Sequence, residues 1–232
     1  FADGTNGNKA TVKKFNNGSW SNVGVGGFSK GDTRYLNFDI DIYGTPYIVF
    51  EDRDINSNDY KSIIMKYDGS DWITVGEEGF KSSGPMKIAV SLDGIPYVLY
   101  NDLESEGKAT VKKFDGSSWL TVGEAGFSAG GAEVYSIELD VNGIPYVAYR
   151  DFTQNLKATV MRFNNNKWEV VGKLGFSSGD AGWISIAIDK SGVPFIGLRD
   201  GIQASVMRFN GEAWEYIGRQ GISEWWVYHT SL

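Results

Sequence analysis

Side chains that could bind a ligand recur at regular places in this chain. An aspartate follows a run of aromatic and β-branched residues five times, at Asp3, Asp52, Asp102, Asp151 and Asp200. Such a carboxylate can accept a hydrogen bond from a ligand hydroxyl or bind a cation, and it can equally accept the backbone N–H groups of its own turn. Its presence in every copy favours the turn. We keep the last four of these aspartates as ligand-binding candidates.

A second set of candidates is aromatic. Tyr35, Tyr135, Trp183 and Trp226 lie outside the tryptophans that recur regularly, at the ends of alternating apolar segments. An exposed aromatic ring can stack on the apolar face of a sugar or hold a protein anchor. The alternative is that these rings fill the top of a central channel.

One acidic loop has the spacing of a calcium site. Asp52, Asp54, Asn56 and Asn58 alternate along it, as the oxygen ligands of a calcium loop do. The glycine and glutamate of an EF-hand are absent, and Ile63 stands at the twelfth position. We therefore expect no cofactor, with calcium at Asp52, Asp54 and Asn56 as the weaker alternative to a solvated acidic turn.

Catalytic arrangements find little support. The single histidine, His229, has no nucleophile elbow to accompany it. Asp39 and Glu138 stand at equivalent places in two repeats and could form the facing carboxylates of a glycosidase. Alanines, Ala89 and Ala187, occupy that place in two other repeats, which favours a binding protein over an enzyme.

Composition excludes several classes of function. The 232 residues carry a net charge of −7, so nucleic acid, which needs a basic surface, is not an expected partner. There is no cysteine, which excludes disulfides and thiolate chemistry. No apolar run approaches the ~18 residues of a membrane span, so we expect no membrane insertion.

Internal repetition is the main structural signal. A strand-like segment such as KATVMRF is followed by a turn, a tryptophan, a Val-Gly or Ile-Gly pair and a GF or GI pair. An alternating segment, a glycine turn and a segment such as PYVAYRD come next, and these turns predict hairpins. The recurring tryptophans are spaced by 52, 47, 49 and 46 residues and are Trp20, Trp72, Trp119, Trp168 and Trp214. We expect all five to lie in the core.

Each repeat therefore predicts four short antiparallel strands. In one copy we expect them at 86–92, 96–102, 108–114 and 119–122, and we expect Phe28, Phe80, Phe127 and Phe176 to plug the space between repeats. Four strands in 40–50 residues are typical of a β-propeller blade. The sequence predicts an all-β, five-bladed β-propeller of four-stranded antiparallel blades, with residues 1–232 as a single domain.

The two ends of the chain look like parts of one blade. Phe1-Ala2-Asp3 matches the end of a second strand, and Trp225–Leu232 matches a first strand. We expect the ring to close by pairing of these N- and C-terminal strands, because closure removes free sheet edges.

The repeat resembles bacterial extracellular β-propeller repeats of the form KATVMKF-DG-W-VG-GFS-G-PYVAY-D, over essentially the whole chain. In architecture only, it also resembles the five-bladed lectins of the tachylectin-2 type. The resemblance implies a protein outside the cell or on its surface. We expect a monomeric, non-catalytic module that binds a glycan at the face where the loops after the second and fourth strands meet. The alternatives are a protein-interaction or structural domain of a larger surface protein, and a glycoside-processing enzyme.

Overall fold

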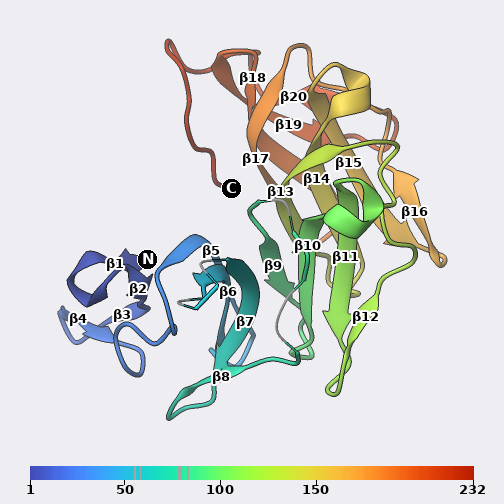
Figure 1. The fold of residues 1–232 in the computed structure, drawn as a ribbon. Coiled ribbons are helices and arrows are strands. Elements are labelled where there is room, and N and C mark those ends of the chain that lie inside the picture. Colours follow the sequence, from blue (N-terminus) through green and yellow to red (C-terminus); the bar gives the residue numbers. More distant parts are fainter. Residues whose placement is uncertain (55, 58, 78–79, 83) are drawn as a thin grey trace.

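The computed structural model describes residues 1–54, 56–57, 59–77, 80–82 and 84–232, and this part of the chain folds into antiparallel sheets without an α-helix. Four sheets have four strands each and two have two strands (Figure 1). We call each four-stranded sheet a blade and number the blades 1 to 4 in chain order. The predicted all-β architecture and its four-stranded antiparallel blades are present.

In each blade the strands follow one another in sequence order, so each strand pairs with the next along the chain. The strands of the blades, in order, are β5 (Thr33–Ile40), β6 (Pro46–Arg53), β7 (Tyr60–Tyr67) and β8 (Trp72–Thr74); β9 (Lys87–Val90), β10 (Pro96–Asp102), β11 (Lys108–Phe114) and β12 (Trp119–Thr121); β13 (Ala132–Leu139), β14 (Pro145–Asp151), β15 (Lys157–Asn164) and β16 (Lys167–Val170); β17 (Ala181–Ile188), β18 (Pro194–Asp200), β19 (Gln203–Phe209) and β20 (Trp214–Tyr216).

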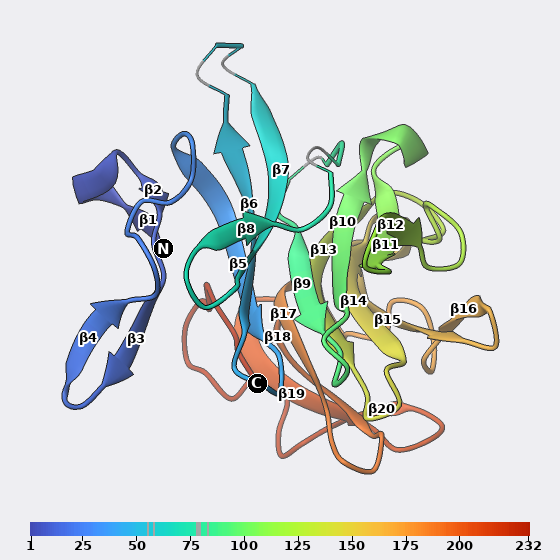
Figure 2. The same ribbon diagram turned by 90° about the horizontal axis from the view of Figure 1, so that it is seen from below.

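The N-terminal residues form a smaller unit, which we call the half-blade. It consists of β1 (Ala2–Asp3) paired with β2 (Lys9–Ala10), and β3 (Lys13–Asn16) paired with β4 (Ser19–Asn22). Figure 2 shows it at one end of the row of blades. Three short 3₁₀ helices are present: η1 (Gly4–Asn6) follows β1 of the half-blade, and η2 (Leu103–Ser105) and η3 (Phe152–Gln154) follow the second strands of blades 2 and 3.

The turn between the first and second strands explains why these hairpins form. Asp41 Oδ1 accepts the backbone N–H groups of Tyr43 and Thr45 at 2.9 and 2.8 Å. Gly44 has φ +83°, a conformation that glycine adopts without strain. Asp140 and Asp189 make the same pair of bonds in blades 3 and 4. The carboxylate thereby fixes the register of the strands that follow.

Tryptophans join neighbouring blades. The indole Nε1 of each one donates to a valine carbonyl of the preceding unit, at 2.8 to 3.0 Å; the pairs are Trp72–Val23, Trp119–Val75, Trp168–Val122 and Trp214–Val171. The same ring packs on a phenylalanine of the preceding unit, in the pairs Phe28–Trp72, Phe80–Trp119, Phe127–Trp168 and Phe176–Trp214. The predicted role of these phenylalanines between repeats is confirmed.

The first tryptophan departs from the prediction that all five recurring tryptophans lie in the core. Trp20 is 66% exposed, whereas Trp72 is 9% exposed. Trp20 belongs to β4 of the half-blade, and among the described residues no preceding unit covers it with a phenylalanine. Burial of the other four requires the unit that comes before each of them.

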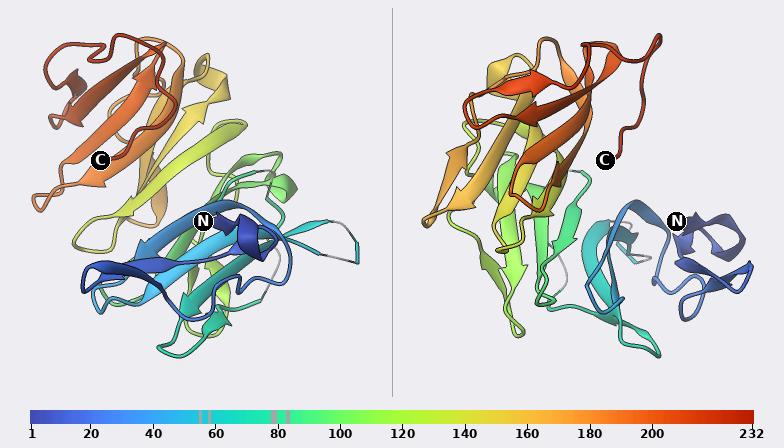
Figure 3. Two further views of the ribbon diagram at one scale, coloured as in Figure 1. Left: turned by 90° about the vertical axis from the view of Figure 1, so that its left-hand side faces the viewer. Right: turned by 180° about the vertical axis from the view of Figure 1, so that it is seen from behind.

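The C-terminal tail, residues 222–232, corrects the prediction of a fifth first strand at Trp225–Leu232. The tail forms no strand, and no pairing links it to β1–β4 in the described part of the chain. Its end lies between blade 4 and the half-blade (Figures 1 and 3). The physical reason is that a strand needs a hydrogen-bonded neighbour, and among the described residues the strand that β1 pairs with is β2.

The tail nevertheless keeps the register of a first strand against blade 4. Leu232 N–H donates to Ser185 Oγ at 3.1 Å. Ile186 N–H makes the matching bond to Ser136 Oγ at 3.3 Å, one blade earlier. Thr230 Oγ1 also donates to the carbonyl of Gly197 at 3.1 Å. The last residues of the tail therefore lie on blade 4 much as β17 lies on blade 3.

Candidate functional site

The candidate site lies at the end of the blades where the loops after the second and fourth strands meet. We call this end the loop face. The first strands reach it with their N-terminal residues, and the second strands reach it with their C-terminal residues. Paired positions on these two strands therefore come together at the loop face.

Two of the predicted aromatic residues are held in an unusual backbone conformation. Tyr35 and Trp183 have φ values of +56° and +50°, and each lies where the register of its strand shifts against the next, at a β-bulge. Positive φ is rare for a bulky residue and is found where the surroundings impose it. The bulges leave the side chains 46% and 38% exposed. A β-bulge commonly redirects a side chain beside a functional site.

The structure brings three of the loop-face aromatic rings together. The ring centres of Tyr135 and Trp183 are 6.3 Å apart, with the rings edge to face. The ring centre of His229 lies 4.5 Å from that of Trp183. Trp226 is 56% exposed, and the guanidinium of Arg199 lies 5.3 Å from its ring centre. The predicted candidates Tyr135, Trp183 and Trp226 thus belong to blades 3 and 4 and the tail.

Tyr35 belongs to a separate cluster in blade 1. The Arg34 guanidinium lies 5.1 Å from the Tyr35 ring centre and 3.7 Å from that of Tyr60. Arg34 Nε donates to Glu51 Oε2 at 2.6 Å, and Glu51 is 5% exposed. The buried carboxylate holds the guanidinium against the two rings, because a charge-assisted bond in a partly buried place is strong.

Sequence reasoning missed a set of ion pairs beside these rings. Arg150 Nη1 donates to Glu133 Oε2 at 3.2 Å, and its Nη2 reaches Asp180 at 2.7 Å, which links blades 3 and 4. Burial and the neighbouring Glu133 carboxylate raise the pKa of Tyr135, which keeps its hydroxyl protonated. The sequence feature that points to these ion pairs is the residue just before each strand-end aspartate. In blades 1 to 4 these residues are Glu51, Asn101, Arg150 and Arg199.

Two of the strand-end aspartates cap their own loops. Asp102 Oδ1 accepts the backbone N–H of Glu104 at 3.0 Å, and its Oδ2 accepts Thr110 Oγ1 at 3.1 Å. Asp151 accepts the backbone N–H of Thr153 and the hydroxyl of Thr159 in the same way. Both aspartates are buried. Their carboxylates are occupied by bonds within the protein.

The other two hold the loops that lead to the bulged aromatic residues. Asp52 Oδ1 accepts Gly31 N–H at 2.8 Å, just before β5 and Tyr35. Asp200 Oδ1 accepts Gly179 N–H at 2.7 Å, just before β17 and Trp183. All four candidate aspartates are therefore placed to shape the loop face from beneath it.

The acidic loop after β6 uses its oxygen atoms for internal bonds. Asp54 Oδ1 accepts the N–H groups of Asn56 and Ser57, and its Oδ2 accepts Lys61 Nζ at 2.9 Å. These bonds lower the pKa of Asp54 to about 2, with Lys61 the largest cause. Asn58 lies outside the described residues. Within those that are described, no group of three or more His, Cys, Asp or Glu side chains is arranged to hold a metal ion.

A small axial cavity of about 180 Å³ lies below the rings and is lined by Asp39, Glu138, Lys87 and the first strands. Burial and the charge of Asp39 raise the pKa of Glu138. Burial also raises the pKa of Asp39. Val90 N–H donates a hydrogen bond of 2.6 Å to the Asp39 carboxylate, which acts in the opposite direction and is outweighed by burial. The predicted pair thus shares one cavity, whose volume is below the roughly 300–1,000 Å³ of ordinary ligand pockets.

No protein-family model matches the chain, and no curated protein matches it. Among solved structures, a lectin from Aleuria aurantia in complex with a fucosyl-GlcNAc sugar is 17% identical, with a TM-score of 0.55 over 89% of this chain and 70% of the lectin. The propeller domain of the Trilobed protease from Pyrococcus furiosus, described as having an open velcro topology, is 13% identical, with a TM-score of 0.51 over 83% of this chain and 60% of that one. The chain has a β-propeller fold.

A Hadza microbial sialidase is also similar, at 12% identity and a TM-score of 0.53 over 80% of this chain. The propeller described here spans only 46% of that sialidase. At these identities the likeness concerns the fold, and one fold serves both binding and catalysis in such proteins. In the described residues of this propeller, no helix has the length and apolar character needed to cross a membrane.

Proposed function

We propose that this propeller is a non-catalytic carbohydrate-binding module whose site is the loop face. The observation that carries the proposal is the pair of bulged residues, Tyr35 and Trp183, which the backbone holds at positive φ with their rings partly exposed. A protein keeps such strained residues where their orientation has a use. Tyr135 extends the aromatic surface next to Trp183, and the Trp226 ring lies against Arg199 of the neighbouring strand β18.

The chemistry of the surroundings suits a sugar. Aromatic rings stack on the apolar C–H face of a pyranose, and fixed charged groups bond its hydroxyls. Arg34 with Glu51, and Arg150 with Glu133 and Asp180, supply both donors and acceptors beside the rings. Asp52, Asp102, Asp151 and Asp200 support the loops in this proposal and do not contact the ligand. The fold likeness to a sugar-binding lectin agrees with this reading.

The test is a glycan array, followed by titration calorimetry on the best glycan. Trp183→Ala and Trp226→Ala should each weaken binding about tenfold or more, because central aromatic contacts dominate such interfaces. Tyr43→Ala is the matched control, since Tyr43 is 79% exposed in a turn at the opposite end of blade 1. A protein that binds no glycan at millimolar concentration, or that tolerates both tryptophan changes, would contradict the proposal.

We extend the proposal to five blades in a monomer that works outside a bacterial cell or on its surface. The half-blade and the tail would together form the fifth blade. The bond from Leu232 N–H to Ser185 Oγ supports this, because it is the bond by which a first strand registers against the preceding blade. The location rests on the resemblance of the repeat to bacterial extracellular propeller repeats. Calcium at Asp52, Asp54 and Asn56 is not part of the proposal.

A glycoside-processing enzyme is the second candidate, and the shared cavity of Asp39 and Glu138 is the observation that favours it. A carboxyl group with a raised pKa can act as a general acid. The test is hydrolysis of chromogenic glycosides by the unmodified protein and by Glu138→Gln. Activity that Glu138→Gln abolishes, while glycan binding persists, would favour the enzyme over the binding module.

A further inference from the structure

One arginine of the loop face lacks the carboxylate partners that its counterpart has. Arg150 and Arg199 stand at the same place in β14 and β18, just before the strand-end aspartate. Arg150 Nη1 donates to Glu133 Oε2 at 3.2 Å, and its Nη2 donates to Asp180 Oδ2 at 2.8 Å. Each terminal nitrogen of Arg150 is therefore bonded to a carboxylate.

The first of these two partners is replaced by glycine in blade 4. Glu133 pairs with Arg150 across β13 and β14, and Gly182 pairs with Arg199 across β17 and β18. A Cβ atom built on Gly182 would lie 2.6 Å from Arg199 Nη2 and 2.9 Å from its Nε. The guanidinium thus lies directly over Gly182, in space that any larger residue would occupy.

The second partner is replaced by tryptophan. Ser177 Oγ and Ser223 Oγ accept equivalent backbone N–H groups from the third strands β15 and β19, both at 2.9 Å. Asp180 comes three residues after Ser177, and Trp226 comes three residues after Ser223. The Trp226 ring centre lies 5.3 Å from the Arg199 guanidinium. An aromatic ring attracts a cation but supplies no carboxylate to bond its N–H groups.

Arg199 therefore keeps N–H donors without a carboxylate at bonding distance. Its Nη1 donates to the Gly201 carbonyl at 3.2 Å, while Asp180 Oδ2 lies 3.9 Å from its Nη2. In the part of the chain that the structure describes, neither its buried Nε nor that of Arg150 has an acceptor, but only Arg150 has both terminal nitrogens bonded to carboxylates. The Arg199 side chain is 12% exposed. A charge that is mostly buried is stabilised by an anionic partner, and this one can be reached from the surface.

Given carbohydrate binding at the loop face, on which this inference rests, we propose that the ligand is an acidic sugar. Its carboxylate bonds the guanidinium of Arg199, and its ring stacks on Trp183, which follows Gly182 directly in β17. Arginine suits this ligand because its fork of N–H groups matches the two oxygens of a carboxylate. The net charge of −7 gives the protein no general attraction for anions, so a preference for acidic sugars would come from this local contact.

The test compares acidic oligosaccharides with their carboxyl-reduced forms, in which each carboxylate has become a neutral primary alcohol. The probes are trigalacturonic acid, a hyaluronan tetrasaccharide and 3′-sialyllactose, titrated into the full chain by calorimetry. At least one acid should bind about tenfold more tightly than its reduced form, because a hydrogen bond to a charged group is the stronger one. Equal binding of both forms, or binding of neutral glycans alone, would overturn the acidic sugar and leave carbohydrate binding standing. No binding of any glycan would overturn both.

Variants of blade 4 locate the carboxylate. Arg199→Gln should reduce the preference for the acid over its reduced form to about twofold or less. Gly182→Glu supplies a carboxylate within the blade, as blade 3 does, and should weaken binding of the acid about tenfold. This second variant keeps Arg199, so it tests the contact even if Arg199→Gln fails to fold. Arg208→Gln is the matched control, because Arg208 is exposed near the far end of β19 and bonds Glu215 there.

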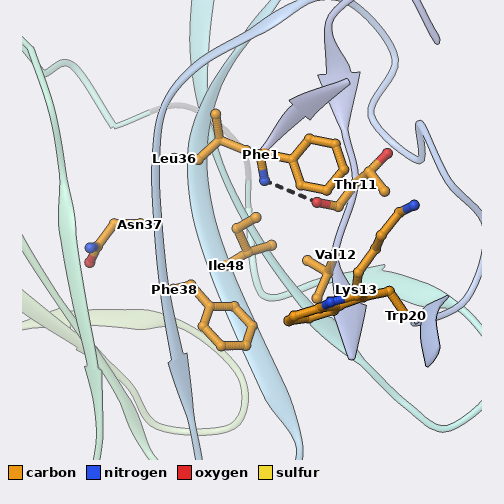
Figure 4. Close-up of a pocket in the computed structure, with 9 residues that line it drawn as sticks. All are labelled: Phe1, Thr11, Val12, Lys13, Trp20, Leu36, Asn37, Phe38 and Ile48. Atoms are coloured by element: carbon orange, nitrogen blue, oxygen red, sulfur yellow. Dashed lines mark hydrogen bonds between the residues drawn. The ribbon is translucent and has the colours of Figure 1, made fainter. Parts of the chain in front are cut away.

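A basic side chain in another hollow provides the competing location. Lys13 is exposed at the groove between the half-blade and blade 1, where Figure 4 shows it with Trp20 and Phe38. Lys13→Gln should leave the preference for the acid unchanged. If Lys13→Gln removed the preference while Arg199→Gln retained it, the acid would bind in that groove and the assignment to Arg199 would be wrong.

Discussion

Trp168 Nε1 donates a hydrogen bond to the Val122 carbonyl at 2.9 Å, and the same indole stacks on the Phe127 ring with 4.0 Å between the ring centres. A single side chain thus ties blade 3 to blade 2 by both a polar and an aromatic contact. Trp168→Phe keeps a ring in the space but leaves the carbonyl without its donor. We expect a loss of about 1–3 kcal/mol in the free energy of unfolding, measured in urea.

Trp225→Phe is the control for this change. Trp225 is 80% exposed in the tail, so its replacement should alter stability by no more than about 0.5 kcal/mol. If the two variants were equally stable, the hydrogen bond between Trp168 and Val122 would make no net contribution to the free energy of unfolding.

A second prediction concerns two hydrogen bonds made by one buried hydroxyl beneath the loop face. Thr159 Oγ1 donates to Asp151 Oδ2 at 3.1 Å and accepts Gly175 N–H at 3.0 Å. Thr159→Val keeps the shape of the side chain but leaves the Gly175 donor and one carboxylate oxygen short of a partner. The expected cost is about 1–3 kcal/mol by thermal or urea unfolding. The exposed Thr121→Val should be close to neutral.

A third prediction concerns pH. The folded-state pKa of Glu138 is raised above 4.5, first by burial and then by the charge of Asp39. The unfolded chain therefore releases this proton at lower pH than the folded protein does. Ionisation thus favours the unfolded state, and stability is lost as pH rises from the unfolded pKa through the folded one. Glu138→Gln should raise the melting temperature at pH 7 and leave it unchanged at pH 3.

The measurement for this prediction is calorimetry of both proteins from pH 3 to pH 8. Glu124→Gln, at an exposed position, controls for the change in net charge. A pH-independent difference between Glu138→Gln and the unmodified protein would show that the effect comes from packing and not from ionisation.

A fourth prediction tests closure of the ring. Gly182 pairs with Arg199 in blade 4, and the same register would place Tyr228 opposite Ala2. Because the chain has no cysteine, the double change Ala2→Cys and Tyr228→Cys introduces one possible disulfide. Mild oxidation should give a cross-linked monomer, seen on a non-reducing gel. Ala2→Cys with Ser191→Cys is the control, and equal cross-linking of both pairs, or none in the first, would contradict a closed ring.

The fold was largely predictable because its signals are local. The Asp41 turn, the alternation along β5 and the tryptophan in every repeat each depend on a few neighbouring residues. The position of the tail was not predictable, because a strand forms only where another chain segment offers hydrogen bonds, and that segment lies more than 200 residues away in the sequence.

For the site, the sequence by itself determined the residue types and their repetition: aromatic residues near the starts of the first strands and an aspartate at the end of each second strand. The tertiary structure decided which of them are accessible. Backbone bulges turn Tyr35 and Trp183 outward, while buried loop N–H groups engage Asp52 and Asp200. Exposure depends on packing between blades, and packing is a property of the assembled sheets rather than of any one repeat.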